Sequence, residues 1–97
     1  METMRFDYPA STTVPRRVCL GVVASGDLEI LLQPSTDGKS HVLIQTSVTG
    51  FGDTWKAVLD WFFSTYTDAA DIVIHDAGAT PGTVALRLQQ AVEESRA

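Results

Sequence analysis

Two short apolar segments joined by a turn constrain the fold of this chain most strongly. Val18–Val23 and Leu28–Leu32 are rich in aliphatic residues, and Ala24-Ser25-Gly26 lies between them. Two such runs on either side of a short glycine-containing turn predict a β-hairpin. If the turn has three residues, Gly26 adopts the left-handed conformation and Ser25 lies at the exposed apex.

The register of this hairpin follows from the three-residue turn. Pairing Val23 with Asp27 gathers the aliphatic side chains on one face, whereas a two-residue turn would set Val22 beside Glu29 and mix the two faces. A three-residue turn is therefore expected. The apolar face then consists of Val18, Leu20, Val22, Leu28, Ile30 and Leu32.

Beyond the hairpin, the hydropathy pattern predicts a strand, a helix, another strand and a second helix. His41–Val48 alternates and Asp71–His75 is a short apolar run, so both are predicted strands. Between them, Asp53 or Thr54 can cap a helix whose apolar residues recur at helical spacing. This stripe consists of Trp55, Val58, Leu59, Phe62 and Tyr66, and Trp61 points away from it.

The second helix is predicted to begin at Thr80, as N-cap, with Pro81 in the first helical position, and to run to about Glu94. It is expected to leave Leu86 on its outer side. The residues that it buries are Val84, Leu88, Ala91 and Val92.

These elements predict an α+β fold. It is a two-layer sandwich in which two helices cover one face of a four-stranded mixed sheet, in the order β-β-β-α-β-α. Residues 17–97 are expected to form the one domain. Residues 1–16 contain Pro9 and Pro15 and show no sustained period. They are expected to form an N-terminal arm that lies over the domain or extends into solvent.

Charge and composition exclude several classes of function. The chain has 97 residues, a net charge of −5 and a single cysteine, Cys19. An acidic chain disfavours nucleic acid and anionic membranes, and no apolar run approaches the ~18 residues that cross a bilayer. The N-terminus lacks the apolar core of a secretory signal, and one cysteine suits a reducing compartment. A cytoplasmic protein without nucleic-acid or membrane partners is expected.

No catalytic residue and no metal ligand is predicted. A hydrolase would need a base beside Ser25, but His75 and Asp76 are neighbours at a strand end and diverge. A metal site would draw on Cys19, His41 and His75, which lack paired ligand spacing. We therefore interpret the histidines, Cys19 and Asp76 as ordinary strand and turn residues without a catalytic or metal-binding role.

Several sequence blocks together resemble one family. They are similar to the acyl carrier (delta) subunit of bacterial malonate decarboxylase and, more distantly, to the acyl carrier (gamma) chain of citrate lyase, which shares the Ser-Gly-Asp turn. The blocks span most of the chain in the same order. They are Gly21–Glu29, Gly50–Trp55, Asp76–Pro81 and Val84–Leu88.

The resemblance implies that Ser25, followed by Gly26 and Asp27, carries a phosphoribosyl-dephospho-coenzyme A arm through a phosphodiester. The thiol of the arm would hold acetyl or malonyl as a thioester. The implied partners are a transferase subunit that exchanges acetyl for malonate, a pair of decarboxylase subunits, and a prosthetic-group transferase. The carrier itself would do no bond chemistry. A protein made without the last enzyme would lack the arm.

A second function stays open on sequence grounds. Ser-Gly is ordinary turn chemistry, so Ser25 can be unmodified in a non-catalytic interaction domain that assembles a complex through Trp61 and Leu86. If the arm is present, Asp27 and Glu29 are expected to add negative charge beside it. Measuring the intact mass distinguishes the two functions. A mass that includes the arm supports the carrier, and an unmodified mass in an assembled complex supports the interaction domain.

Overall fold

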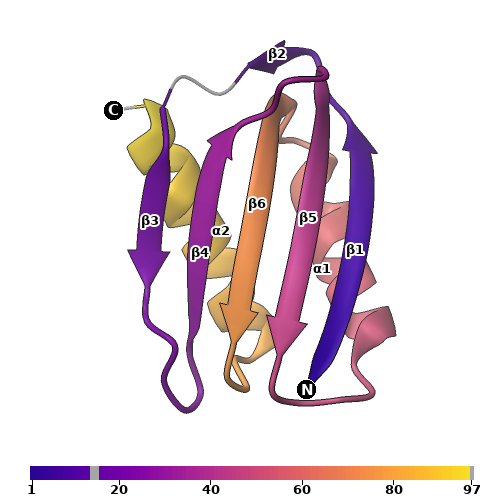
Figure 1. The fold of residues 1–97 in the computed structure, drawn as a ribbon, viewed down its shortest axis with the longest axis vertical. Coiled ribbons are helices and arrows are strands. Elements are labelled where there is room, and N and C mark those ends of the chain that lie inside the picture. The colour runs from indigo at the N-terminus through magenta and orange to yellow at the C-terminus, as the bar shows by residue number, and fades with distance from the viewer. Residues whose placement is uncertain (14–15, 97) are drawn as a thin grey trace.

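One mixed β-sheet carries two α-helices on the same face (Figure 1). The computed structural model describes residues 1–13 and 16–96. The strands are β1 (Glu2–Pro9), β2 (Thr12–Thr13), β3 (Val18–Gly21), β4 (Leu28–Pro34), β5 (Lys39–Thr46) and β6 (Asp68–Asp76), and the helices are α1 (Gly52–Phe63) and α2 (Pro81–Arg96).

The strands of the described residues lie in the order β1-β5-β6-β4-β3, and β2 pairs with the start of β6. β5 and β6 are parallel and joined by α1, as expected for a β-α-β connection. The other pairs in the row are antiparallel. The predicted α+β class and mixed sheet are confirmed. The four-strand prediction in the order β-β-β-α-β-α is wrong for the chain, because β1 and β2 precede those elements.

The core lies between the sheet and the helices. Alternate residues of the strands point toward the helices, and the predicted stripes of both helices supply the facing side chains. Trp61 and Leu86 lie outside this core, each 57% exposed, as predicted. The fully enclosed aliphatic side chains include Leu28, Ile30, Ile44, Leu59, Ile72, Ile74 and Leu88.

The segment expected to be an arm contributes β1 at one edge of the sheet. Glu2–Pro9 pairs along its whole length with β5, and Tyr8 stacks on Phe63 of α1 with ring centroids 4.2 Å apart. The Tyr8 hydroxyl also donates to Asp60 at 2.7 Å. The arm prediction is therefore wrong for these residues. Val14 and Pro15 lie outside the described residues, and the boundary after residue 16 stays a prediction.

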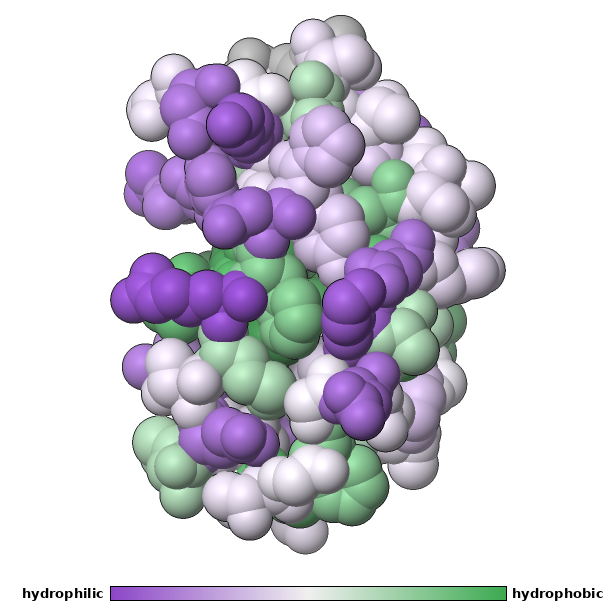
Figure 2. All heavy atoms as spheres, turned by 90° about the vertical axis from the view of Figure 1, so that its right-hand side faces the viewer, coloured by the Kyte–Doolittle hydropathy of each residue, from purple (hydrophilic) through white to green (hydrophobic). Residues whose placement is uncertain are grey.

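β1 shows the half-buried alternation of a strand covered on one side. Met4, Phe6 and Tyr8 pack against the core, whereas Arg5 and Asp7 point to the open face of the sheet. Figure 2, which views the molecule from the side of β1 and α1, shows hydrophobic patches among hydrophilic side chains on this side. None of the described helices combines the length and hydrophobicity needed to cross a membrane.

The helix starts were predicted with mixed success. α1 begins at Gly52 after Phe51, with no side-chain cap, so the proposed Asp53 or Thr54 cap is wrong. Gly50 has a φ of 90°, which lets the loop turn sharply into the helix. At α2, the Thr80 hydroxyl accepts the backbone N–H of Thr83 at 3.2 Å, which confirms the predicted N-cap.

His41 holds two carboxylates on the open face of the sheet. Its Nδ1 lies 2.6 Å from Asp7 and its Nε2 lies 2.7 Å from Asp37. Only a protonated ring donates from both nitrogens. Hydrogen bonds to Asp7 and Asp37 raise the pKa of His41, and the bond to His41 helps to lower the pKa of Asp37 to about 2.

This cluster predicts a pH-dependent stability. Because the pKa of His41 is raised in the folded state, its contribution is complete below the ordinary histidine pKa of about 6.5 and is lost as pH rises through the raised value. We expect the free energy of unfolding of the wild type, relative to His41→Gln, to fall as the pH rises above about 6.5. Urea denaturation at several pH values measures this. Parallel pH profiles for the two proteins would contradict the assignment.

Candidate functional site

The β3–β4 hairpin keeps the predicted register but has a wider loop. Val18 pairs with Leu32, and the pairing continues to Gly21 with Glu29. The pairing stops there, so Val22–Asp27 lies outside the ladder, and the three-residue loop is wrong. Gly21 causes this early end because its φ of 85° belongs to the left-handed region, which breaks the extended strand.

Ser25 lies in a tight turn at the tip of this loop. The backbone N–H of Asp27 donates to the carbonyl of Ala24 at 2.9 Å, and Gly26 has a φ of 78°. The left-handed conformation of Gly26 is confirmed. Ser25 is exposed, and Val22, predicted on the inner face, is 57% exposed. The hydroxyl is therefore open to solvent on a turn of defined shape.

The serine turn is hydrogen bonded to the segment that follows the central strand. The N–H of Gly26 donates to the carbonyl of Ala77 at 2.7 Å, and the N–H of Ala77 donates to the carbonyl of Asp27 at 3.0 Å. Ala77 is the first residue after β6, which is paired on both sides. These two bonds hold the loop at a fixed position although its tip is exposed.

Asp27 ties the same turn to α2. Its carboxylate accepts from Arg87 Nε at 3.2 Å and Nη2 at 2.8 Å, and from the N–H of Leu28 at 2.8 Å. The Arg87 hydrogen bonds are the main reason why the pKa of Asp27 is lowered. Glu29 lies 2.9 Å from Nδ1 of His75. Both carboxylates have partners, and Arg87 offsets the charge of Asp27. Whether the two residues add negative charge beside an arm stays a prediction.

If the Asp27–Arg87 pair stabilises the serine turn, removing it should speed up hydrogen exchange of the amides in the turn. We expect Asp27→Asn and Arg87→Met each to accelerate hydrogen exchange at the Gly26 and Asp27 amides several-fold, since each removes the bidentate contact. The double variant should exchange as fast as either single one. Glu93→Gln, an exposed change on the same helix, serves as the control. Additive effects of the two changes would show that the residues act separately.

No base is hydrogen bonded to Ser25 in the part of the chain that the structure describes. Within the described residues, no histidine or carboxylate accepts a hydrogen bond from its hydroxyl. His75 contacts Glu29 on the open face, whereas Asp76, only 6% exposed, accepts from the Thr46 hydroxyl at 2.8 Å. Neighbouring strand residues point to opposite faces, as predicted. No cluster of histidine, cysteine and acidic side chains in this part of the chain could hold a metal ion.

Three residues of the site were missed from the sequence. Gly21 ends the ladder, Ala77 anchors the turn, and Arg87 binds Asp27 from 60 positions away. Arg87 lies within one of the recognised blocks, but no spacing rule links it to the hairpin. The glycine in an otherwise apolar strand was the one available signal for the early end of β3.

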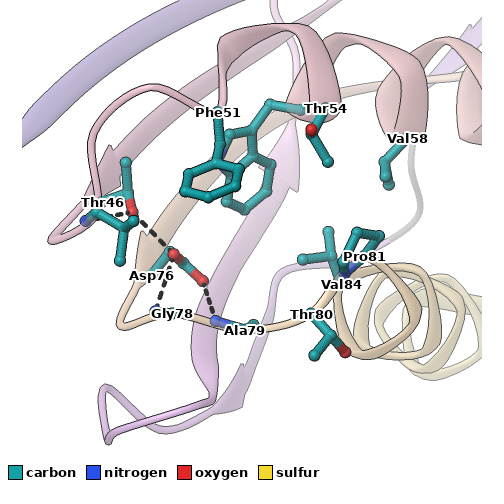
Figure 3. A pocket seen from close by; sticks show the side chains of 12 residues that line it. Thr46, Phe51, Thr54, Val58, Asp76, Gly78, Ala79, Thr80, Pro81 and Val84 are labelled. Carbon is teal, nitrogen blue, oxygen red and sulfur yellow. Dashed lines mark hydrogen bonds between the residues drawn. The ribbon is translucent and has the colours of Figure 1, made fainter.

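A pocket of about 380 Å³ lies beside this site, between the N-terminal turns of α1 and α2 (Figure 3). One side is formed by the segment after β6, where Asp76 accepts from the backbone N–H groups of Gly78 at 3.1 Å and Ala79 at 3.0 Å. These bonds shape the segment that also holds the serine turn. Phe51, at the start of α1, lies across the pocket from them.

The fold and the site define a class of small α+β protein that presents an exposed serine on an anchored hairpin and has no catalytic group beside it among the described residues. Comparison with known proteins identifies the family within this class. Residues 15–95 match the family described as malonate decarboxylase delta subunit (MdcD). The chain belongs to this family.

Characterised relatives match almost the whole chain. The malonate decarboxylase acyl carrier protein of Pseudomonas aeruginosa is 47% identical over 96 residues, covering 98% of this chain and 97% of the relative. That of Azotobacter vinelandii is 43% identical over 95 residues, covering 97% and 96%. A chain in the crystal structure of a Pseudomonas malonate decarboxylase hetero-tetramer in complex with malonate has a TM-score of 0.93 and 46% identity, covering 98% of this chain and 99% of that one.

Proposed function

We propose that this chain is the acyl carrier subunit of a malonate decarboxylase and that Ser25 is its attachment point. The observation that carries the proposal is the exposed hydroxyl on a turn held by Ala77 and Arg87. A covalent arm needs an attachment atom that a modifying enzyme can reach and that the fold holds in place. Family membership and the relatives' names support the carrier role.

The proposed arm is phosphoribosyl-dephospho-coenzyme A, joined to Ser25 through a phosphodiester. Gly26 leaves the approach to the hydroxyl open, because nothing lies within 4 Å of the position that a Cβ would occupy there. Asp27 is a positioning residue, since its carboxylate is engaged by Arg87. The chain does no bond chemistry in this proposal. It presents the thioester end at high effective concentration to other subunits.

The proposed partners are a transferase subunit, decarboxylase subunits and a prosthetic-group transferase. The similarity to a chain of a hetero-tetramer supports a role in a larger assembly. Exposed apolar side chains at the same end of the molecule as the serine support contact surfaces there. They lie in the loops after β3 and β5, two strands that end at the same edge of the molecule in Figure 1 with β4 and β6 between them. They are Val22, Val23, Val48 and Phe51.

Intact-mass spectrometry tests this function. The chain is produced together with the subunits and modifying enzymes encoded beside it, and peptide mapping locates any added group. A mass gain that matches the coenzyme A derivative, located on Ser25, is the expected result. An unmodified chain in a fully assembled complex would instead favour the interaction domain, whose candidate contacts Trp61 and Leu86 are exposed on the helices.

A further inference from the structure

Attachment of an arm at Ser25 leaves the neighbouring pocket without a role. Asp76 and Gly78 line this pocket, and Ala77 between them holds the serine turn through two backbone hydrogen bonds. Its volume of about 380 Å³ lies at the lower end of the range for small-molecule sites. The serine turn is thus hydrogen bonded to a segment of the pocket wall, so a flexible group tethered at Ser25 would start close to the pocket.

The inner wall of the pocket is apolar. Trp55 and Val84 are almost completely buried there, and Val58, which is partly buried, also lines the pocket. At the mouth, Phe51 is half exposed and Thr54 carries a hydroxyl, as Figure 3 shows. An apolar wall with a few polar groups at the rim favours a ligand end of low polarity.

The charges around the pocket select against an anion. No lysine, arginine or histidine is among the residues that line it, whereas the carboxylate of Asp76 is part of its wall. The N-termini of α1 and α2 bring partial positive charge, which Asp76 and the first-turn residue Asp53 offset. A second carboxylate placed beside Asp76 would meet like-charge repulsion at low dielectric.

Building on the function proposed above, we propose that this pocket receives the neutral acetyl-thioester end of the arm and excludes the malonyl end. The acetyl methyl and the thioester sulfur lie against Trp55 and Val84. The terminal carboxylate of malonyl stays outside, in solvent or in a partner subunit. The pocket thus shelters the resting acetyl thioester from water and leaves the loaded malonyl form extended.

Nuclear magnetic resonance of the modified full-length chain tests the pocket. In a Trp61→Phe background, Trp55 gives the one indole N–H signal, because the sequence has two tryptophans. The acetyl form should shift this signal relative to the free thiol and give nuclear Overhauser effects between the acetyl methyl and Val84. The malonyl form should resemble the free thiol. Cleavage of the acetyl thioester by hydroxylamine should be at least about twofold slower than in a denatured sample, because tethering supplies a millimolar effective concentration.

Two matched variants separate the pocket from general effects. Thr54→Phe fills the mouth and should abolish the shift and the protection, whereas Ala57→Phe, exposed on the same helix and away from the pocket, should preserve both. Equal signals for the acetyl and malonyl forms would overturn the proposal. An absent arm in the intact mass would instead overturn the carrier function. In that case, titration of the unmodified chain with S-acetyl-N-acetylcysteamine still tests the pocket through Trp55.

Discussion

Replacing Ser25 with alanine is expected to abolish the mass gain completely. The hydroxyl oxygen is the atom that would form the phosphodiester, and alanine has no substitute for it. The fold should be unaffected, because Ser25 is exposed and the turn is held by backbone bonds of Gly26 and Asp27. Intact mass after production with the modifying enzymes, together with urea denaturation, measures both effects.

Ser47→Ala is the matched control for this change. Ser47 is also exposed, and it follows β5 at the same end of the molecule, so it tests whether any serine there accepts the group (Figure 1). This control should keep the full mass gain. A gain that persists in Ser25→Ala and disappears in Ser47→Ala would move the attachment to the other loop.

Gly21→Ala is expected to give a large loss of stability. Gly21 has a φ of 85°, which disfavours any residue with a Cβ by about 1–2 kcal/mol. An added Cβ would also overlap the backbone carbonyl oxygen of Leu28, which a rotamer change cannot relieve. The backbone strain at residue 21 and the forced shift of the Leu28 carbonyl should together lower the free energy of unfolding, measured by urea denaturation, by about 2–4 kcal/mol.

Gly38→Ala separates conformational strain from crowding. Gly38 also has a positive φ, of 75°, but nothing lies within 4 Å of its added Cβ. This variant should lose only about 1–2 kcal/mol. If Gly21→Ala lost no more than Gly38→Ala, the predicted overlap with the Leu28 carbonyl would contribute nothing to the loss of stability.

The sequence predicted the elements whose apolar period is strong. The register of β3 with β4 was correct because alternation over Val18–Leu32 allows one arrangement of the faces. The Thr80 cap and the α1 stripe from Trp55 to Phe62 were correct for the same kind of local reason, whereas Tyr66 joins the core from beyond the end of the helix. Strand β1 was missed, although Met4, Phe6 and Tyr8 alternate with polar residues, because the prolines of the segment suggested a loop.

Contacts between residues far apart in the chain could not be predicted from sequence patterns. The Asp27–Arg87 pair joins a loop to a helix, and each residue taken alone resembles an ordinary exposed charge. For this reason the sequence did not reveal that Arg87 offsets the charge of Asp27 beside the serine. The exposed serine turn and the left-handed Gly26 were predictable, since both depend on neighbouring residues alone. The role of Ser25, Gly26 and Asp27 in holding an arm stays a prediction.

The position of Ala77 determines how the hairpin would bear mechanical load. Ala77 directly follows β6, which is flanked by parallel β5 on one side and antiparallel β4 on the other. Tension applied through the serine therefore passes into the middle of the sheet and not only into β3 at its edge. Hydrogen bonds on two sides must then yield together, so the hairpin resists being peeled away from the sheet.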